Sequence, residues 1–210
     1  MNLKTSLTAL VMAAALPAQA ALTYNAADIL DPNVIDFSAY DGFETMGPET
    51  VAPGVVFTGD MGSVLGAYIA DLGSNGTWGA GNHFAAAPAV GELRFTFSQG
   101  PTRGAGALVN HFALGDLFPF SVVVSAYGDN NQIIETHTVT VDTAPDSLND
   151  GLFIGIVRPT ADVRSIAFKG NYVVVDDFTF STPVPEPETY AMMLAGLGLL
   201  GLAVRRRKAD

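Results

Sequence analysis

The most constraining feature of the chain is a run of short apolar segments between residues 22 and 183, cut by Gly, Pro, Asn and Asp. In segment 92–97, Leu93, Phe95 and Phe97 alternate with three polar residues, which is the pattern of a strand with one buried face. Strands of this kind are predicted at 34–37, 55–58, 64–72, 92–97, 105–112, 120–127, 133–141, 152–157, 164–169 and 173–180.

Turn residues support the same interpretation. Residues 128–131, Gly-Asp-Asn-Asn, supply hairpin-turn chemistry between two of the predicted strands. Segment 25–30 could form one helical turn, and nothing else between residues 22 and 183 holds a helical apolar stripe. The sequence therefore predicts an all-β fold, an antiparallel β-sandwich of the jelly-roll type, over residues 21–180.

Charge and cysteine content exclude several classes of protein. The chain has a formal net charge of −11, and 18 acidic residues against five basic ones lie between residues 22 and 183. A body this acidic is repelled by polyphosphate, so nucleic acid is not an expected partner. The sequence contains no cysteine, which excludes disulfides, thiolate metal sites and thiol nucleophiles.

The N-terminal segment 1–20 has the three parts of a secretory signal peptide. Lys4 gives the positive start, residues 7–16 form a short apolar stretch, and Ala18 and Ala20 are the small residues that a signal peptidase requires. An uncleaved membrane anchor is the alternative, but the stretch is too short to span a bilayer. We expect cleavage after Ala20 and export from the cytoplasm.

The C-terminal segment predicts a membrane anchor. A proline-rich linker, 181–188, precedes a predicted transmembrane helix, 189–204, and a basic tail, 205–210. The fourteen apolar residues from 191 to 204 rise about 21 Å, which is short of a hydrocarbon core of about 30 Å. The cations of the tail are expected to stop transfer and to stay in the cytoplasm. They are Arg205, Arg206, Arg207 and Lys208.

These C-terminal features resemble the PEP-CTERM sorting signal. The matching parts are Pro185, Glu186 and Pro187, then Thr189 and an aromatic residue, then the short apolar helix and the basic tail. The resemblance implies processing by an exosortase, a membrane-embedded protease of Gram-negative bacteria that make exopolysaccharide. It also implies a protein held in the inner membrane with a periplasmic domain, and later carried to the cell surface or extracellular matrix.

The body resembles the galactose-binding-like jelly-roll domains that often precede this signal. The segments that carry the resemblance are 34–37, 53–57, 93–97, 153–156 and 175–180. The resemblance implies the fold but does not identify a ligand.

Asp176 is the first candidate for a special site. Phe178 and Phe180 are expected to face the core, and a period of two places Asp176 on the same side. A buried carboxylate requires an arginine, several amide donors or a cation. The alternatives are a cap by backbone N–H groups or by Arg164, and a bound cation.

Calcium is the natural cation for oxygen ligands outside the cell. The resemblance to galactose-binding-like domains implies a structural Ca²⁺ between the first and last strands. Asp36 or Asp41 would then lie beside Asp176 or Asp177. We expect such an ion to stabilise the fold rather than to take part in chemistry.

Trp78 is the second candidate. It lies in the glycine-rich segment 74–84, where an indole could stack on a sugar ring. The alternative is that Trp78 folds inward and closes one end of the sandwich.

Catalytic patterns are weak. His83, His111 and His137 are scattered and form no H-x-x-x-H pair, and no G-x-S-x-G motif occurs. We therefore expect an exported, non-enzymatic surface or matrix protein. The first alternative is a carbohydrate-binding module that recognises an extracellular polysaccharide, and the second is a polysaccharide lyase or hydrolase.

Overall fold

The structure of the protein is a computed structural model, and it describes residues 21–115, 121–184 and Leu197. The predicted signal peptide, the sorting motif and the basic tail lie outside the described residues. The predicted helix 189–204 is described at Leu197 alone. Within these described ranges, no helix is long and apolar enough to cross a membrane.

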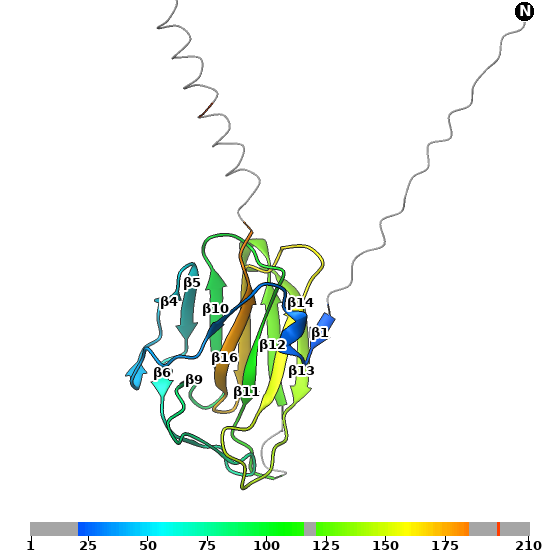
Figure 1. Cartoon of the computed structure of the whole chain (residues 1–210). Helices are drawn as coiled ribbons and strands as arrows, with labels where there is room; N and C mark the ends of the chain where they lie inside the picture. Colours follow the sequence, from blue (N-terminus) through cyan, green and yellow to red (C-terminus); the bar gives the residue numbers. More distant parts are fainter. Residues whose placement is uncertain (1–20, 116–120, 185–196, 198–210) are drawn as a thin grey trace, which may run out of the picture.

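Two antiparallel sheets pack face to face, which confirms the predicted all-β sandwich (Figure 1). The larger sheet contains β1 (Ala21–Thr23), β2 (Pro32–Ile35), β3 (Phe43–Glu44), β6 (Val64–Ala67), β9 (Phe84–Ala86), β11 (Gly104–Asn110), β14 (Leu152–Val157) and β16 (Val174–Ser181). Its order is β1-β14-β11-β16-β9-β6-β3, and β2 also pairs with β16. The C-terminal half of β16 therefore pairs with β2, and its N-terminal end pairs with β9.

The second sheet has six strands in the order β13-β12-β15-β10-β5-β4. They are β4 (Glu49–Ala52), β5 (Val55–Gly59), β10 (Gly91–Phe97), β12 (Ser121–Tyr127), β13 (Ile133–Thr140) and β15 (Ser165–Gly170). A separate ribbon is formed by β7 (Ala70–Asp71) and β8 (Thr77–Trp78), and two 3₁₀ turns are η1 (Ala26–Asp28) and η2 (Asp129–Asn131). The predicted strand 64–72 is thus divided between β6 and β7.

The core lies between the two sheets and is rich in phenylalanine. Residues of β10 alternate as expected, because Leu93, Phe95 and Phe97 are buried while their neighbours are half-buried. Phe95 stacks on Phe178 of the opposite sheet with ring centroids 4.0 Å apart. Burial of such a side chain contributes about 1.5–3 kcal/mol, so these rings are a major part of what holds the sheets together.

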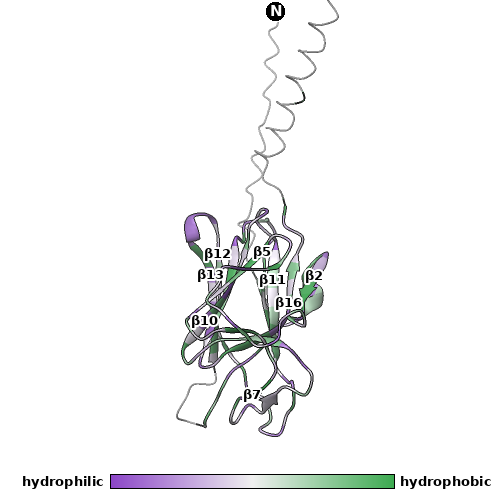
Figure 2. Ribbon diagram, turned by 90° about the vertical axis from the view of Figure 1, so that its left-hand side faces the viewer, coloured by the Kyte–Doolittle hydropathy of each residue, from purple (hydrophilic) through white to green (hydrophobic). Residues whose placement is uncertain are grey.

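A smaller core covers the outer face of the larger sheet. Trp78, Phe84 and Val174 are fully buried there with Leu72 and Ala67. This second cluster lies under the loops that contain β7 and β8. Figure 2 shows β7 at the extremity of this end of the sandwich.

The two ends of the sandwich are built from different segments of the chain. At one end, called the linker end, β16 finishes at Ser181 beside the starts of β1 and β11 and the finish of β14 (Figure 1). The opposite end, called the loop end, is made by loops 68–83 and 142–151, which contact each other through the Thr77–Leu148 bridge. The described part of the linker therefore leaves the domain away from the second core.

Candidate functional site

The linker is tied to the domain until just before the predicted sorting residues. The hydroxyl of Thr102 donates a hydrogen bond of 2.7 Å to the carbonyl oxygen of Ser181. The backbone N–H of Val184 donates one of 2.9 Å to the carbonyl oxygen of Pro101. Residues 185–187 follow directly, so the hydrogen bonds between linker and domain continue up to Val184.

Asp176 lies on the opposite face of the sheet from the one we expected. A β-bulge in β16 shifts the register against β11, and Asp177 at the bulge adopts a left-handed backbone with φ 46°. Because of this extra residue, Val175 and Phe178 both face the main core, while Asp176 shares its face with Val174 of the second core. The strict period of two was therefore wrong at this point, although the carboxylate is still buried, with 5% exposure.

The buried carboxylate of Asp176 is held by two donors. The side-chain amide of Asn82 donates a hydrogen bond of 2.8 Å to it, and the backbone N–H of Asp177 donates one of 2.7 Å. Burial raises the pKa of Asp176 to about 6; these two hydrogen bonds oppose the rise, and the charges of Asp177 and Asp36 add to it. Amide donors rather than arginine thus cap the carboxylate, since Arg164 pairs with Asp129.

The carboxylates predicted to bind calcium lie near one another. Asp36 is close enough for its charge to help raise the pKa of Asp176, and Asp177 adjoins Asp176. Asp36 accepts hydrogen bonds from the backbone and hydroxyl of Ser38, which lower its pKa. Among the described residues no three acidic or histidine side chains gather as a metal-holding group. The calcium site therefore stays a prediction.

Trp78 closes the second core. Its side chain has 0% exposure, and its ring meets Phe84 edge-on with centroids 5.3 Å apart. The indole N–H donates a hydrogen bond of 2.6 Å to the carbonyl oxygen of Asp150, which ties loop 68–83 to loop 142–151. Of the two alternatives for Trp78, the structure agrees with inward folding, and the sugar-stacking prediction is wrong because a fully buried ring presents no face to a ligand.

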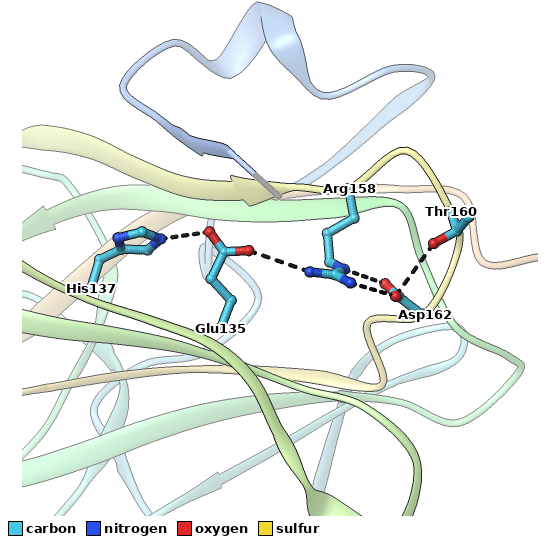
Figure 3. Close-up of polar contacts among 5 residues, drawn as sticks. All are labelled: Glu135, His137, Arg158, Thr160 and Asp162. Carbon is cyan, nitrogen blue, oxygen red and sulfur yellow. Dashed lines mark hydrogen bonds and ion pairs between the residues drawn. The ribbon is translucent and has the colours of Figure 1, made fainter. Parts of the chain in front are cut away.

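A chain of charged side chains bridges the two sheets at their edges (Figure 3). Glu135 and His137 point inward from β13, and Glu135 accepts from the His137 imidazole at 2.5 Å. The other oxygen of Glu135 lies 3.5 Å from the guanidinium of Arg158, which follows β14. Arg158 in turn makes a two-bond pair with Asp162, at 2.6 and 2.7 Å. This pairing raises the pKa of Arg158.

Sequence reasoning missed this network, although the signal was present. Glu135 and His137 alternate in step with the buried Val139 and Val141. The pattern therefore predicts that both polar side chains point toward the interior of the sandwich. Inward-pointing charges on an edge strand oppose pairing with a foreign strand. The network therefore places inward-pointing charges on β13, the edge strand of its sheet, as expected for an edge protected from foreign pairing.

The three histidines have separate partners. The Nδ1 atom of His83 lies 2.9 Å from the carbonyl oxygen of Tyr40, while His137 pairs with Glu135. His111 is buried between two backbone carbonyl oxygens, and burial lowers its pKa. The three histidines therefore contact three different partners.

A groove of about 610 Å³ runs along the outer face of the larger sheet, beside the second core. Its walls are mostly apolar, and Asp71 provides a carboxylate. Phe112 and Tyr172 meet edge-on in it with centroids 6.0 Å apart, and Tyr172 is half-exposed. The ring of Tyr172 in this groove is thus accessible to a ligand, whereas the ring of Trp78 is not.

Comparison with known proteins identifies the end of the chain. Residues 183–208 match the family model described as the PEP-CTERM protein-sorting motif. The chain carries a PEP-CTERM sorting motif. This motif implies an exported protein that is anchored through its C-terminus, as the resemblance of Pro185, Glu186 and Pro187 predicted. Ala18 and Ala20 of the predicted signal peptide lie outside the described residues.

The β-sandwich is similar to solved carbohydrate-binding modules. Two point mutants of CBM29-2, a family 29 carbohydrate-binding module, match with 13% and 15% sequence identity and TM-scores of 0.37 and 0.33. The matches cover 74% and 80% of this chain, and 98% and 99% of the modules. No curated protein matches the chain. Likenesses with TM-scores this low support no conclusion about the fold or the ligand of this chain.

Proposed function

We propose that this is an exported, non-enzymatic cell-surface or extracellular-matrix protein whose C-terminal PEP-CTERM anchor is cut by an exosortase. In this proposal a signal peptidase removes residues 1–20 and the predicted helix 189–204 holds the chain in the inner membrane. The acidic β-sandwich is then the part that is delivered to the surface.

The observation that carries the proposal is the position of the motif relative to the folded body. Val184 makes the last hydrogen bond of the described linker, and Pro185 is the next residue. A cut within or after residues 185–187 therefore leaves intact both cores and all strands of residues 21–115 and 121–184. The histidines support a non-catalytic body, because each of them is bound to a different structural partner.

The test is to express the full chain in a host that contains an exosortase and to measure the mass of the mature protein. We expect a product that begins at Ala21 and lacks the basic tail. Pro185→Ala should block the C-terminal cut, whereas Pro159→Ala, a change at an exposed proline elsewhere, should not. An unprocessed product that still ends at Asp210 in that host would overturn the proposal.

Carbohydrate binding is the second candidate, and the groove is the observation that favours it. The exposed ring of Tyr172 can stack on a sugar, and the carboxylate of Asp71 in the same groove can accept hydrogen bonds from sugar hydroxyls. We expect Tyr172→Ala to abolish binding to an extracellular polysaccharide, with unchanged melting temperature. Tyr24→Ala, at an equally exposed ring outside the groove, is the control. If the wild-type protein binds no glycan on an array, this candidate is excluded.

A further inference from the structure

The linker end of the sandwich lies close to the predicted anchor. Six residues, 185–190, separate Val184 from the apolar stretch that begins at Ala191. A fully extended chain spans at most about 3.3–3.6 Å per residue, so the tether reaches no more than about 25 Å. As long as the anchor is uncut, the linker end is therefore held within this distance of the lipid.

Exposed apolar side chains surround the point where the linker leaves. Leu30, Val34 and Val184 are exposed by 64%, 57% and 43%. Two hollows of about 430 and 170 Å³ flank the linker, and both are lined by Leu30, Arg103 and Ser181. Apolar side chains next to an arginine suit the boundary between lipid headgroups and acyl chains. There the methylene groups of the arginine side chain are buried while its guanidinium stays in water.

The cations of the body gather at this same end. Three of its five basic residues are here: Arg103 is exposed, while Arg158 and Arg164 pair with Asp162 and Asp129. Cleavage after Ala20 would add an ammonium group at Ala21, which pairs with Val157 next to Arg158. The acidic residues at this end are Asp28, Asp31, Asp129, Glu135 and Asp162, so after cleavage they exceed the cations by a single charge.

The loop end is strongly acidic by contrast. Loops 68–83 and 142–151 contain no lysine or arginine. Their acidic residues are Asp71, Asp142, Asp146 and Asp150. An anionic surface repels this end and attracts a cation by about 1 kcal/mol per residue near the headgroups. The short tether, the exposed apolar side chains and the difference in charge between the two ends therefore favour the same orientation, with the linker end toward the membrane.

We propose that, before the anchor is cut, the linker end docks on the surface of a lipid bilayer that contains anionic headgroups, through Leu30, Val34, Val184 and Arg103. This inference rests on the proposed function, since it requires the C-terminal anchor. The docked domain holds its loop end, with the groove, away from the membrane. The motif then lies between the domain and the lipid, where a membrane-embedded protease reaches it.

The test uses the full chain in vesicles that contain anionic lipid and a nitroxide quencher on the headgroups. Because the protein has no cysteine, Gln99→Cys at the linker end and Ala144→Cys at the loop end each give a single labelling site. Both positions are exposed and uncharged in the wild-type chain. We expect strong quenching of a fluorophore at position 99 and little at position 144.

A pair of charge variants tests the contribution of Arg103. In the Gln99→Cys background, Arg103→Ala should lower the ratio of docked to undocked protein about fivefold, the equivalent of about 1 kcal/mol. Lys169→Ala removes the same charge from an exposed position on the other sheet and should leave the ratio unchanged. Raising the salt concentration should reproduce the effect of Arg103→Ala, because screening weakens surface attraction.

The outcomes separate the two proposals. If the chain does not float with the vesicles, the anchor is absent, and the proposed function fails together with the docking. If the chain floats but positions 99 and 144 are quenched equally, the docking is wrong while the anchor stands. Equal loss of docking in Arg103→Ala and Lys169→Ala would show a non-specific charge effect and would also overturn the assignment of this surface.

Discussion

The buried carboxylate of Asp176 should make the protein less stable as the pH rises. Its pKa is raised in the folded state to about 6, above the value of 3.8 for a free side chain. Between these two values the folded state binds more protons than the unfolded state, so its stability falls with increasing pH. A difference of about two pKa units corresponds to roughly 3 kcal/mol of unfolding free energy, lost by pH 7.5.

Asp176→Asn isolates this effect because the amide is neutral at every pH. The amide oxygen can still accept from the backbone N–H of Asp177, and the amide of Asn82 can turn over to accept from the new donor. We expect the variant to match the wild type near pH 4 and to exceed its unfolding free energy by up to about 3 kcal/mol at pH 7.5.

The assay is urea denaturation at both pH values in the presence of a chelator, which keeps calcium out of the comparison. Asp146→Asn, an exposed change in loop 142–151, is the control and should give the same difference from wild type at both pH values. The reasoning fails if Asp176→Asn differs from the wild type by the same amount at pH 4 and pH 7.5. It also fails if the wild type becomes more stable relative to the variant as the pH rises.

Three further perturbations test the calcium prediction, the packing of the main core and the edge strand β13. Calcium added at pH 7.5 should raise the melting temperature of the wild type but not of Asp176→Asn, and equal shifts in both would exclude a calcium site at this carboxylate. Phe178→Ala should lower the unfolding free energy by about 3–5 kcal/mol in urea denaturation, because it removes the ring stacked on Phe95 and leaves a cavity; a loss below 1 kcal/mol would contradict this packing. Glu135→Leu should leave Arg158 paired with Asp162 but remove the inward charge from the edge strand, so we expect more self-association in analytical ultracentrifugation than for Thr138→Leu on the outer face of β13.

The alternation of apolar and polar residues was sufficient to predict the sandwich. It was not sufficient to predict which face of the sheet each side chain of β16 occupies. The alternation of Leu93, Phe95 and Phe97 determines which side of β10 is buried, whatever the rest of the fold does. The bulge at Asp177 depends instead on pairing with β11, which is distant in sequence, so the pattern could not show it. A strand read in isolation therefore gave the correct burial of Asp176 and the wrong face.

Burial of Trp78 was one of two alternatives that its sequence left open. Its segment is polar and rich in glycine, which is typical of an exposed loop. The indole is covered because Asp150, from a loop seventy-two residues further along the chain, accepts its N–H. The terminal signals, by contrast, are read from contiguous residues, and the match at 183–208 confirmed the sorting motif without any knowledge of the fold.

The position of β16 has a mechanical consequence for a protein tethered by its C-terminus. A pull on the linker runs along this strand, which is bonded to β11 on one side and to β2 and β9 on the other. All of these ladders resist in shear, so they must rupture together rather than open one bond at a time. A pull on the linker is thus borne by the interior of the larger sheet and not by an edge that could peel away.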